Sequence, residues 1–196
     1  MQTYSTTDII KILQSKEINL FTLSDFAKIF ELDNQQTLYK KIARLEQKQI
    51  IKKLIKGKYQ FLFAKTNDFY IANFLYSPSY ISLESALSFH SIITGFTYQI
   101  TSLTPKPTKT ITTDDHEYKY THLSPSLFWG YEKKANFLLA EAEKAFLDYV
   151  YLTTKGLRNP IFDEMDLSSL NQERLELYLQ KFHNQPMSKI IQKLKI

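Results

Sequence analysis

Amide and cationic side chains gather on one side of a short segment in the N-terminal third of the chain. Leu38, Ile42 and Leu45 recur at the spacing of one apolar helix face. Gln can form paired hydrogen bonds with adenine, and Lys or Arg can bind guanine, both in the major groove of DNA. The segment therefore predicts a helix that buries one face and reads bases with the other. At 100° per residue, that other face carries Gln36, Lys40, Ala43, Arg44 and Gln47.

A basic hairpin is predicted directly after this helix. Residues 51–55 and 59–63 are rich in strand-forming side chains, and Lys56-Gly57-Lys58 supplies the turn, with Gly57 free to adopt a positive φ. A solvated helix and a charged edge hairpin would explain the composition, but cations on both elements favour a surface that binds a polyanion. Against one acid, Glu46, this region holds eight cations, Lys40, Lys41, Arg44, Lys48, Lys52, Lys53, Lys56 and Lys58.

A second constellation has the residue types of a metal-dependent nuclease. Asp114 and Asp115 precede an E-x-K pair, Glu117 and Lys119, whose side chains point to the same side of an expected strand. Nucleases of the restriction type hold Mg²⁺ with such acids and place the lysine near the attacked phosphate. A polar strand face explains the same residues, so the nuclease remains an alternative.

Other catalytic or cofactor motifs are not apparent in the sequence. It has four glycines and no GxxxxGK[ST] or GxGxxG motif, and no cysteine. Two of the four histidines, His116 and His122, flank an expected strand and are interpreted as surface residues, and His183 completes no metal spacing. His90 is predicted to lie at the rim of the core with a backbone partner. We therefore expect no cofactor, no metal and no enzymatic activity.

The positive charge of the chain is unevenly distributed. The 196 residues carry a net charge of +5, and residues 1–65 hold 12 Lys and Arg against 6 Asp and Glu, which leaves 13 against 14 in the other 131. A basic segment joined to a neutral one predicts a polyanion-binding domain attached to an effector domain. No apolar run approaches the roughly 20 residues of a membrane span, and the N-terminus lacks signal-peptide features. A soluble cytoplasmic protein is expected.

The elements that must position the basic face are predicted to be those of a winged helix-turn-helix domain over residues 1–66. Thr7-Asp8 can cap a first helix, and residues 18–21 are extended. Thr22 followed by Asp25 resembles a capping box for a second helix that ends near residue 31, and Asp33 or Asn34 can cap the third. Two short helices joined by three or four residues fit a helix-turn-helix.

Residues 67–196 are predicted to form an α+β domain, a small antiparallel sheet packed by helices. Ser82 can cap a helix that runs to about residue 93, and three or four antiparallel strands are expected between Phe96 and Tyr131. Gly156 is placed to end the clearest helix, and two further helices are expected over about 169–182 and from Pro186. The polar side of the clearest helix is expected to hold Glu141, Lys144 and Asp148.

The order of three segments resembles AbiEi-type antitoxins of type IV (abortive-infection) toxin–antitoxin systems. The segments are the basic block ending in LIKGKYQF, then SPSYISLESALSFHSI, then AEAEKAFLDYVYL, and they lie within residues 20–152. The second is the most specific, and the third contains a Glu-Lys-Ala-hydrophobic-hydrophobic-Asp helix, Glu143 to Asp148. The chain departs from the family at Gln49 and Ser91, where the family often has Gly.

This resemblance implies a protein that represses its own promoter and neutralises a toxin. Such antitoxins bind repeats in the double-stranded DNA of their own promoter through the winged helix, and inverted repeats are expected here. Their C-terminal domain counteracts a cognate nucleotidyltransferase-like toxin, with or without direct contact. Carried onto this sequence, the implied DNA-binding residues are Gln35, Gln36, Thr37, Lys40, Lys41, Arg44, Lys56 and Lys58. The rival hypotheses are the metal-dependent nuclease and a winged-helix transcription factor that senses a small ligand.

Overall fold

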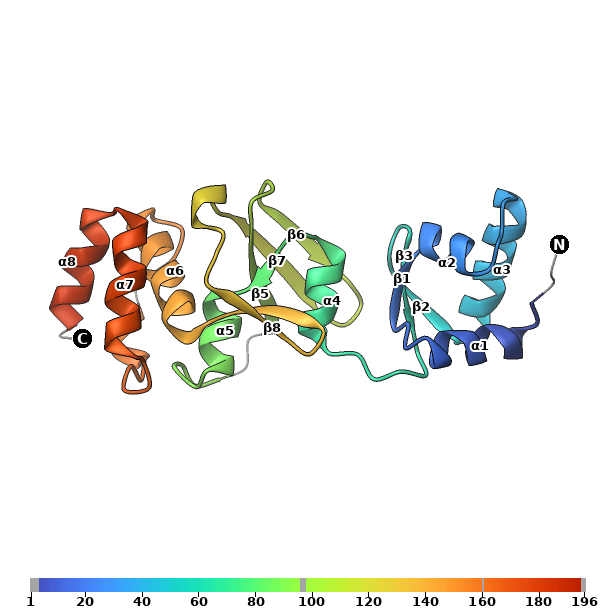
Figure 1. Ribbon diagram of the computed structural model, residues 1–196, viewed down its shortest axis with the longest axis horizontal. Helices are drawn as coiled ribbons and strands as arrows, with labels where there is room; N and C mark the ends of the chain where they lie inside the picture. The colour runs from blue at the N-terminus through green and yellow to red at the C-terminus, as the bar shows by residue number, and fades with distance from the viewer. Residues whose placement is uncertain (1–3, 96–97, 160, 195–196) are drawn as a thin grey trace. The chain divides into compact units, whose positions relative to one another are not determined.

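The computed structural model describes residues 4–95, 98–159 and 161–194, and it divides the chain into two compact units (Figure 1). Unit 1 spans Met1–Asn67 and unit 2 spans Asp68–Ile196. Helices and strands occur in both units, so the chain is α+β. Each unit is described by itself.

Unit 1 combines three helices with a three-stranded antiparallel sheet. The sheet has the order β1-β3-β2, so the first strand pairs with the last one. Its core combines aliphatic and aromatic side chains, and Phe21, Phe26, Phe30 and Phe61 are almost fully buried there. The elements are α1 (Thr6–Ser15), β1 (Leu20–Thr22), α2 (Leu23–Ile29), α3 (Gln35–Gln47), β2 (Ile51–Ile55) and β3 (Lys58–Phe61).

Local capping interactions start all three helices of unit 1. The expected capping box of α2 is confirmed, because the Thr22 hydroxyl accepts from the Asp25 amide and the Asp25 carboxylate accepts from the Thr22 amide. Asn34 caps α3 by accepting from the Thr37 amide at 3.0 Å. The expected cap of α1 was wrong by two residues: Ser5 is the cap and Asp8 completes its capping box. The reason is that Ser5 stands three positions before Asp8, the spacing at which the two residues can cap each other's backbone amide.

Unit 2 is built on a six-stranded sheet that helices cover on both faces. The hydroxyl of Tyr120 donates to the carbonyl of Ala72 in α4 on one face, whereas Thr101, on the opposite face, exchanges hydrogen bonds with Ser85 in α5. The helices are α4 (Asp68–Leu75), α5 (Leu83–Phe89), α6 (Ala142–Thr154), α7 (Gln172–Phe182) and α8 (Gln185–Leu194). The strands are β4 (Tyr80–Ile81), β5 (Gln99–Thr104), β6 (Lys109–Thr112), β7 (Glu117–His122), β8 (Tyr131–Lys134) and β9 (Phe137–Ala140).

The sheet of unit 2 is mixed, and the expectation of three or four antiparallel strands was wrong. Its order is β6-β7-β5-β4-β9-β8, and β5 pairs with β7, and β4 with β9, in parallel. The chain returns from β6 so that β7 lies between β6 and β5, an arrangement that strand propensity does not reveal. The expected strand from Phe96 begins at Gln99, and its residues 96–97 lie outside the described residues.

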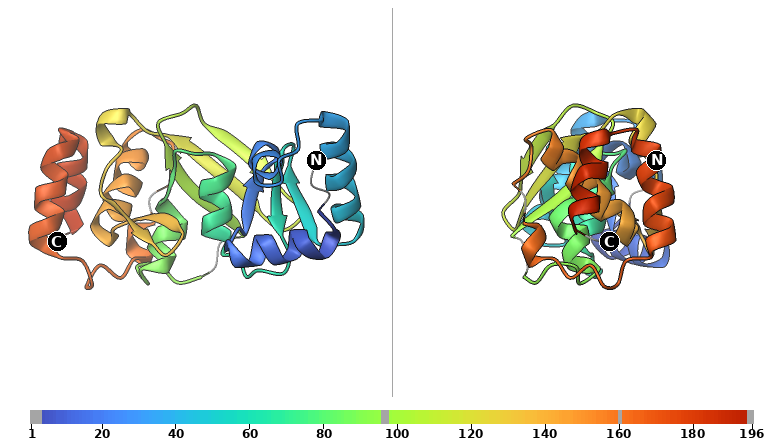
Figure 2. Two further views of the ribbon diagram at one scale, coloured as in Figure 1. Left: turned by 45° about the vertical axis from the view of Figure 1, so that its right-hand side comes forward. Right: turned by 90° about the vertical axis from the view of Figure 1, so that its left-hand side faces the viewer.

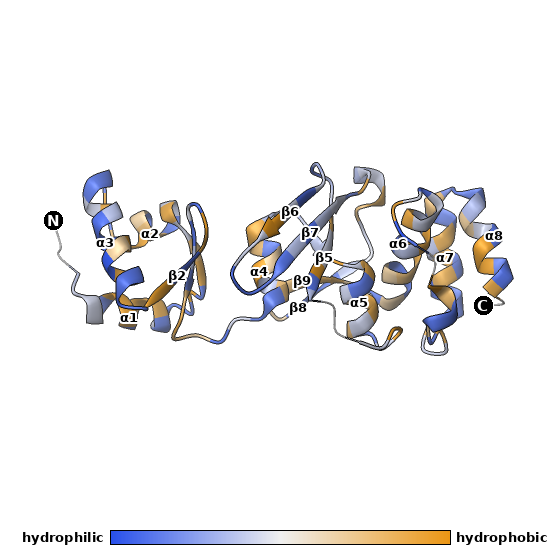
Figure 3. Cartoon of the chain, turned by 180° about the vertical axis from the view of Figure 1, so that it is seen from behind, coloured by the Kyte–Doolittle hydropathy of each residue, from blue (hydrophilic) through white to orange (hydrophobic). Residues whose placement is uncertain are grey.

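The helices of unit 2 differ from the predicted ones in extent. The helix α4 was missed, and α5 ends at Phe89, about four residues early, because Ser91 adopts a φ of 60°. After α6, Gly156 has a φ of 68° and ends the helix as expected. The helices α6, α7 and α8 lie side by side at one end of unit 2 (Figures 1 and 2). Hydrophilic and hydrophobic residues alternate along α3 and α7 (Figure 3), as expected of amphipathic helices.

A buried ionic network joins α6 to the strand β4. Lys144 and Asp148, expected on the polar side of the helix, are both 0% exposed, so that expectation was wrong. Burial lowers the pKa of Lys144 and raises the pKa of Asp148. The Asp148 carboxylate accepts from Lys144, the Tyr80 hydroxyl at 3.0 Å and the Ser82 hydroxyl at 2.9 Å. Ser82 and Tyr80 lie 66 and 68 positions before Asp148 in the chain. Helical periodicity does not detect such distant partners, so it placed Lys144 and Asp148 on the solvent-exposed side of the helix.

Candidate nucleic-acid interface

The outward face of α3 carries the amide and cationic side chains predicted from its periodicity. Leu38, Ile42 and Leu45 are buried in the core of unit 1. The opposite face is exposed over about three turns, from Gln36 to Gln47, and holds one acid, Glu46, at its margin. The exposed predicted residues on α3 are Gln35, Gln36, Lys40 and Arg44, together with Gln47.

Lys41 lies apart from that outward face. Its ammonium group donates a 2.8 Å hydrogen bond to the backbone carbonyl of Tyr4, just before α1. Burial, and next the charge of Arg44, lower the pKa of Lys41. Thr37 also turns toward α1 and is half-buried. The structure therefore separates two of the predicted DNA-binding residues from the others and directs them at the junction of α1 and α3.

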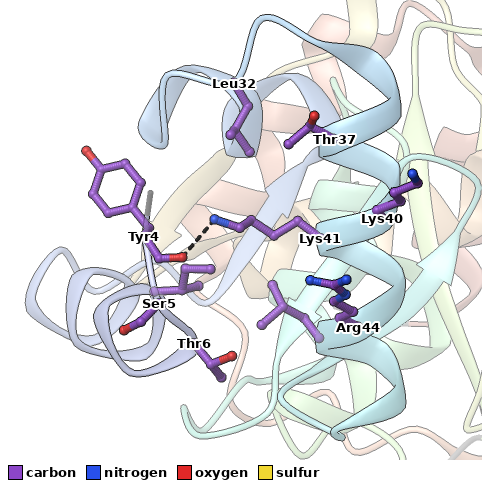
Figure 4. A pocket seen from close by; sticks show the side chains of 10 residues that line it. Tyr4, Ser5, Thr6, Leu32, Thr37, Lys40, Lys41 and Arg44 are labelled. Carbon is purple, nitrogen blue, oxygen red and sulfur yellow. Dashed lines mark hydrogen bonds between the residues drawn. The ribbon is translucent and has the colours of Figure 1, made fainter. Parts of the chain in front are cut away.

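A cavity of about 390 Å³ lies at this junction (Figure 4). Its cationic wall comes from α3 and consists of Lys40, Lys41 and Arg44, and its hydroxyl groups come from Ser5, Thr6 and Thr37. Apolar side chains of the core, including Ile9, Leu32 and Leu45, form the rest of the lining. Lys40 and Arg44 are thus shared between the cavity and the outward face of α3.

The β2–β3 hairpin places its cations at the turn, as predicted. Lys56 is exposed and Lys58, the first residue of β3, is half-buried. Gly57 between them has a φ of 79°, which confirms the predicted left-handed turn residue. Lys58 also pairs with Thr22 and Ile55 across the sheet. The turn therefore joins directly to the strand that holds β1 and β2 together.

Two residues near the site were not predicted. Tyr39 is 55% exposed on α3, one turn after the start of the helix, and could have been recognised as an aromatic residue outside the apolar stripe. Thr6 lines the cavity from α1, and its hydroxyl lies 3.4 Å from the ammonium group of Lys48. No local sequence signal reveals Thr6, because its partners are more than 30 positions away.

The E-x-K residues of unit 2 lie on β7, and their surroundings are those of a polar strand face. Glu117 accepts a hydrogen bond from the side chain of Gln99 on the neighbouring strand. Lys119 lines a shallow hollow with Glu84 and Arg158, which form an ion pair at 2.7 Å. Within residues 4–95, 98–159 and 161–194, no three His, Cys, Asp or Glu side chains are grouped so that they could hold a metal ion.

The predicted backbone partner of His90 is confirmed. Its Nε2 donates to the carbonyl of Ala140 at 2.8 Å, and the side chain is half-buried. His122 is exposed and its Nδ1 lies 3.1 Å from the carbonyl of Lys106. His116 is half-buried and its Nε2 lies 3.4 Å from the Asp68 carboxylate. These contacts fit structural roles for the three histidines.

Among the residues that the structure describes, no helix is both long enough and apolar enough to cross a bilayer. Comparison of the chain with protein-family models and with curated proteins found no match.

Proposed function

We propose that this protein is a cytoplasmic DNA-binding autorepressor and antitoxin that counteracts a cognate nucleotidyltransferase-like toxin. In this proposal unit 1 is a winged helix-turn-helix domain and unit 2 is the effector domain. The helices α2 and α3 form the helix-turn-helix, α3 is the recognition helix, and the β2–β3 hairpin is the wing.

The observation that carries the DNA-binding part is the arrangement of unit 1. Its order α1-β1-α2-α3-β2-β3, with β1 paired to β3, is the order expected of a winged helix-turn-helix. Residues 30–34 connect α2 to α3, a short turn of five residues where three or four were expected. The outward face of α3 is long enough for several base pairs, and Gln36, Lys40 and Arg44 have side chains that can read base edges.

Electrostatics supports the same assignment. Cations on α3 and at the hairpin turn flank the exposed amides, so phosphate contacts on either side would orient the helix in the major groove. Capture of duplex DNA would then depend strongly on salt, because each neutralised phosphate releases a counterion. Inverted repeats in the promoter would bind two copies of the chain, one on each half-site.

The antitoxin part is supported by the resemblance of two segments of unit 2 to AbiEi-type antitoxins. The structure places these segments together, since Tyr80 and Ser82 of the first meet Lys144 and Asp148 of the second. Their central residues are buried, which favours a role in the scaffold of unit 2 rather than in contact with a toxin. The neutralising surface would therefore be formed by other, exposed residues of unit 2.

A binding experiment tests the DNA-binding part. Fluorescence anisotropy would compare a labelled duplex from immediately upstream of the gene with a scrambled duplex of equal length and composition. We expect tighter binding to the upstream duplex. Equal affinity for both at moderate salt would contradict the repressor, and Mg²⁺-dependent cleavage that is lost in Glu117→Ala would establish the nuclease instead.

A growth experiment tests the antitoxin part with the full chain. The adjacent gene would be induced alone, with the wild-type protein, and with the Lys40→Ala plus Arg44→Ala variant. Rescue by both proteins is expected if unit 2 carries antitoxicity independently of DNA binding. A toxic adjacent gene that neither protein counteracts would contradict the antitoxin, and a thermal shift with a metabolite would then favour a ligand-sensing regulator.

A further inference from the structure

The cavity between α1 and α3 concentrates positive charge in a partly enclosed space. Three cations, Lys40, Lys41 and Arg44, line it from two successive turns of one helix. Its volume of about 390 Å³ falls in the range of small-ligand sites, roughly 300–1,000 Å³. The acid whose charge acts on Lys41 is Asp8, and the carboxylate of Asp8 already accepts hydrogen bonds from the backbone and hydroxyl of Ser5. The cavity therefore has an excess of positive charge.

The hydrogen-bond donors around the cavity suit a tetrahedral oxyanion. The hydroxyls of Thr6 and Thr37 face it from two helices, and Lys41 is held between them by its bond to the Tyr4 carbonyl. In α1 the capping box occupies the amides of Ser5 and Asp8, whereas the amides at the first two helical positions have no partner within an α-helix. An anion at this place would accept from groups that converge from both helices.

We propose that this cavity binds one backbone phosphate of the DNA duplex that α3 reads. The proposal rests on the proposed function and adds α1, through Thr6, to the DNA-binding surface. Lys40 and Arg44 belong both to the cavity and to the outward face of α3. A polyanion that lies along that face can therefore place one of its own anionic groups in the cavity. A phosphate clamped between two helices would fix the angle at which α3 enters the groove.

The test introduces one negative charge into the cavity. Thr6→Glu places a carboxylate beside Lys41 and Lys48, and an acid at the first position of a helix is favourable for folding. Gln14→Glu is the matched control, because Gln14 is exposed on the same helix about 12 Å further along its axis. Circular dichroism of both full-length variants would verify the fold.

The readout is the affinity for a 20-base-pair duplex over a series of salt concentrations. We expect Thr6→Glu to weaken binding at least tenfold and to reduce the slope of log K against log salt by about one. Gln14→Glu should change the affinity less than twofold. Equal losses in the two variants, or no loss in Thr6→Glu, would overturn the binding of a duplex phosphate in this cavity.

A second measurement separates failure of this site from failure of the proposed function. Inorganic phosphate alone would be titrated into the full chain while the amide resonances of Thr6 and Lys41 are followed by NMR. Saturable shifts that disappear in Thr6→Glu support the cavity as a phosphate site even if the wild-type chain binds no duplex, which would refute only the proposed function. The same shifts together with unaltered duplex binding by Thr6→Glu would overturn the duplex as the source of the phosphate.

Discussion

The hydroxyl of Tyr80 donates a 3.0 Å hydrogen bond to Asp148, 68 positions later in the chain. The same carboxylate accepts from Lys144, whose ammonium group also lies 4.9 Å from the centre of the Trp129 ring. These contacts together link β4, α6 and the segment before β8 around one buried charge pair. Because the pair is fully buried, the stability of unit 2 depends on every group that compensates it.

Removal of the charge on Asp148 should strongly destabilise unit 2. Asp148→Asn keeps the shape of the side chain but leaves Lys144 without a counter-ion, and loss of one partner of a buried pair costs about 3–5 kcal/mol. Unfolding in urea can be followed through Trp129, the single tryptophan of the chain. The control is Glu132→Gln, which breaks the exposed ion pair with Lys134 at 2.9 Å and should cost about 0–1 kcal/mol. Similar midpoints for the two variants would contradict the importance of the network.

Two glycines of unit 2 offer a matched test of packing against Lys144. Gly130 and Gly156 have φ values of 72° and 68°, so alanine at either position carries a left-handed penalty of about 1–2 kcal/mol. A Cβ at Gly130 would lie 2.8 Å from Cγ of Lys144, whereas one at Gly156 would meet nothing within 4 Å. Lys144 is buried and has no room to move aside. Gly130→Ala should therefore lower the free energy of unfolding by about 1–3 kcal/mol more than Gly156→Ala does. Equal losses of unfolding free energy in the two variants would show that the side chain of Lys144 shifts to accommodate the new Cβ, which would contradict the prediction.

Features set by neighbouring residues were predictable from the sequence. The capping box of Thr22 and Asp25, the apolar stripe of α3 and the left-handed Gly57 each depend on interactions within a few positions. The order of strands in unit 2 and the burial of Lys144 depend on distant partners, so composition and periodicity could not reveal them. In the candidate interface, periodicity identified the outward face of α3 but not the turn of Lys41 toward Tyr4, which needs the position of α1.

The two departures from the resembled family gain a physical meaning in the structure. Gln49 and Ser91 stand where that family often has Gly, and they adopt φ values of 52° and 60°. Each follows a helix, α3 or α5, and lies where the chain reverses through a left-handed residue. The backbone at both positions thus has the conformation that glycine favours, although the side chains differ.

The capping box of α2 should make unit 1 sensitive to acid. Hydrogen bonds from the Thr22 hydroxyl and amide lower the pKa of Asp25. A lowered pKa in the folded state stabilises unit 1 above the pKa of the unfolded chain, about 3.9, and this stability is lost as the pH falls through the folded value. Thr22→Ala should lower the free energy of unfolding of unit 1 by about 0.5–2 kcal/mol at neutral pH. It should also raise the pKa of Asp25 in a carboxyl NMR titration, and an unchanged titration would contradict the reciprocal cap.

The cations on the outward face of α3 should set the salt dependence of DNA binding. With roughly four to six phosphate contacts, the wild-type chain should show a slope of log K against log salt of about −4 to −5. Lys40→Ala plus Arg44→Ala should abolish selective binding to the upstream duplex, because both side chains can contact base edges or phosphates, and should make the remaining slope shallower by about two. Both side chains are exposed, so the fold should be retained.

The control for this variant removes the same charge from α1 and from its C-cap residue. Lys11→Ala plus Lys16→Ala eliminates two exposed cations of unit 1 that lie on neither α3 nor the hairpin and do not line the cavity. If contact with DNA occurs through α3, this control should retain selectivity and nearly the full salt slope, since only long-range attraction is reduced. Equal effects of the two double variants would mean that net charge rather than the face of α3 determines binding, and the assignment of α3 as the recognition helix would then be wrong.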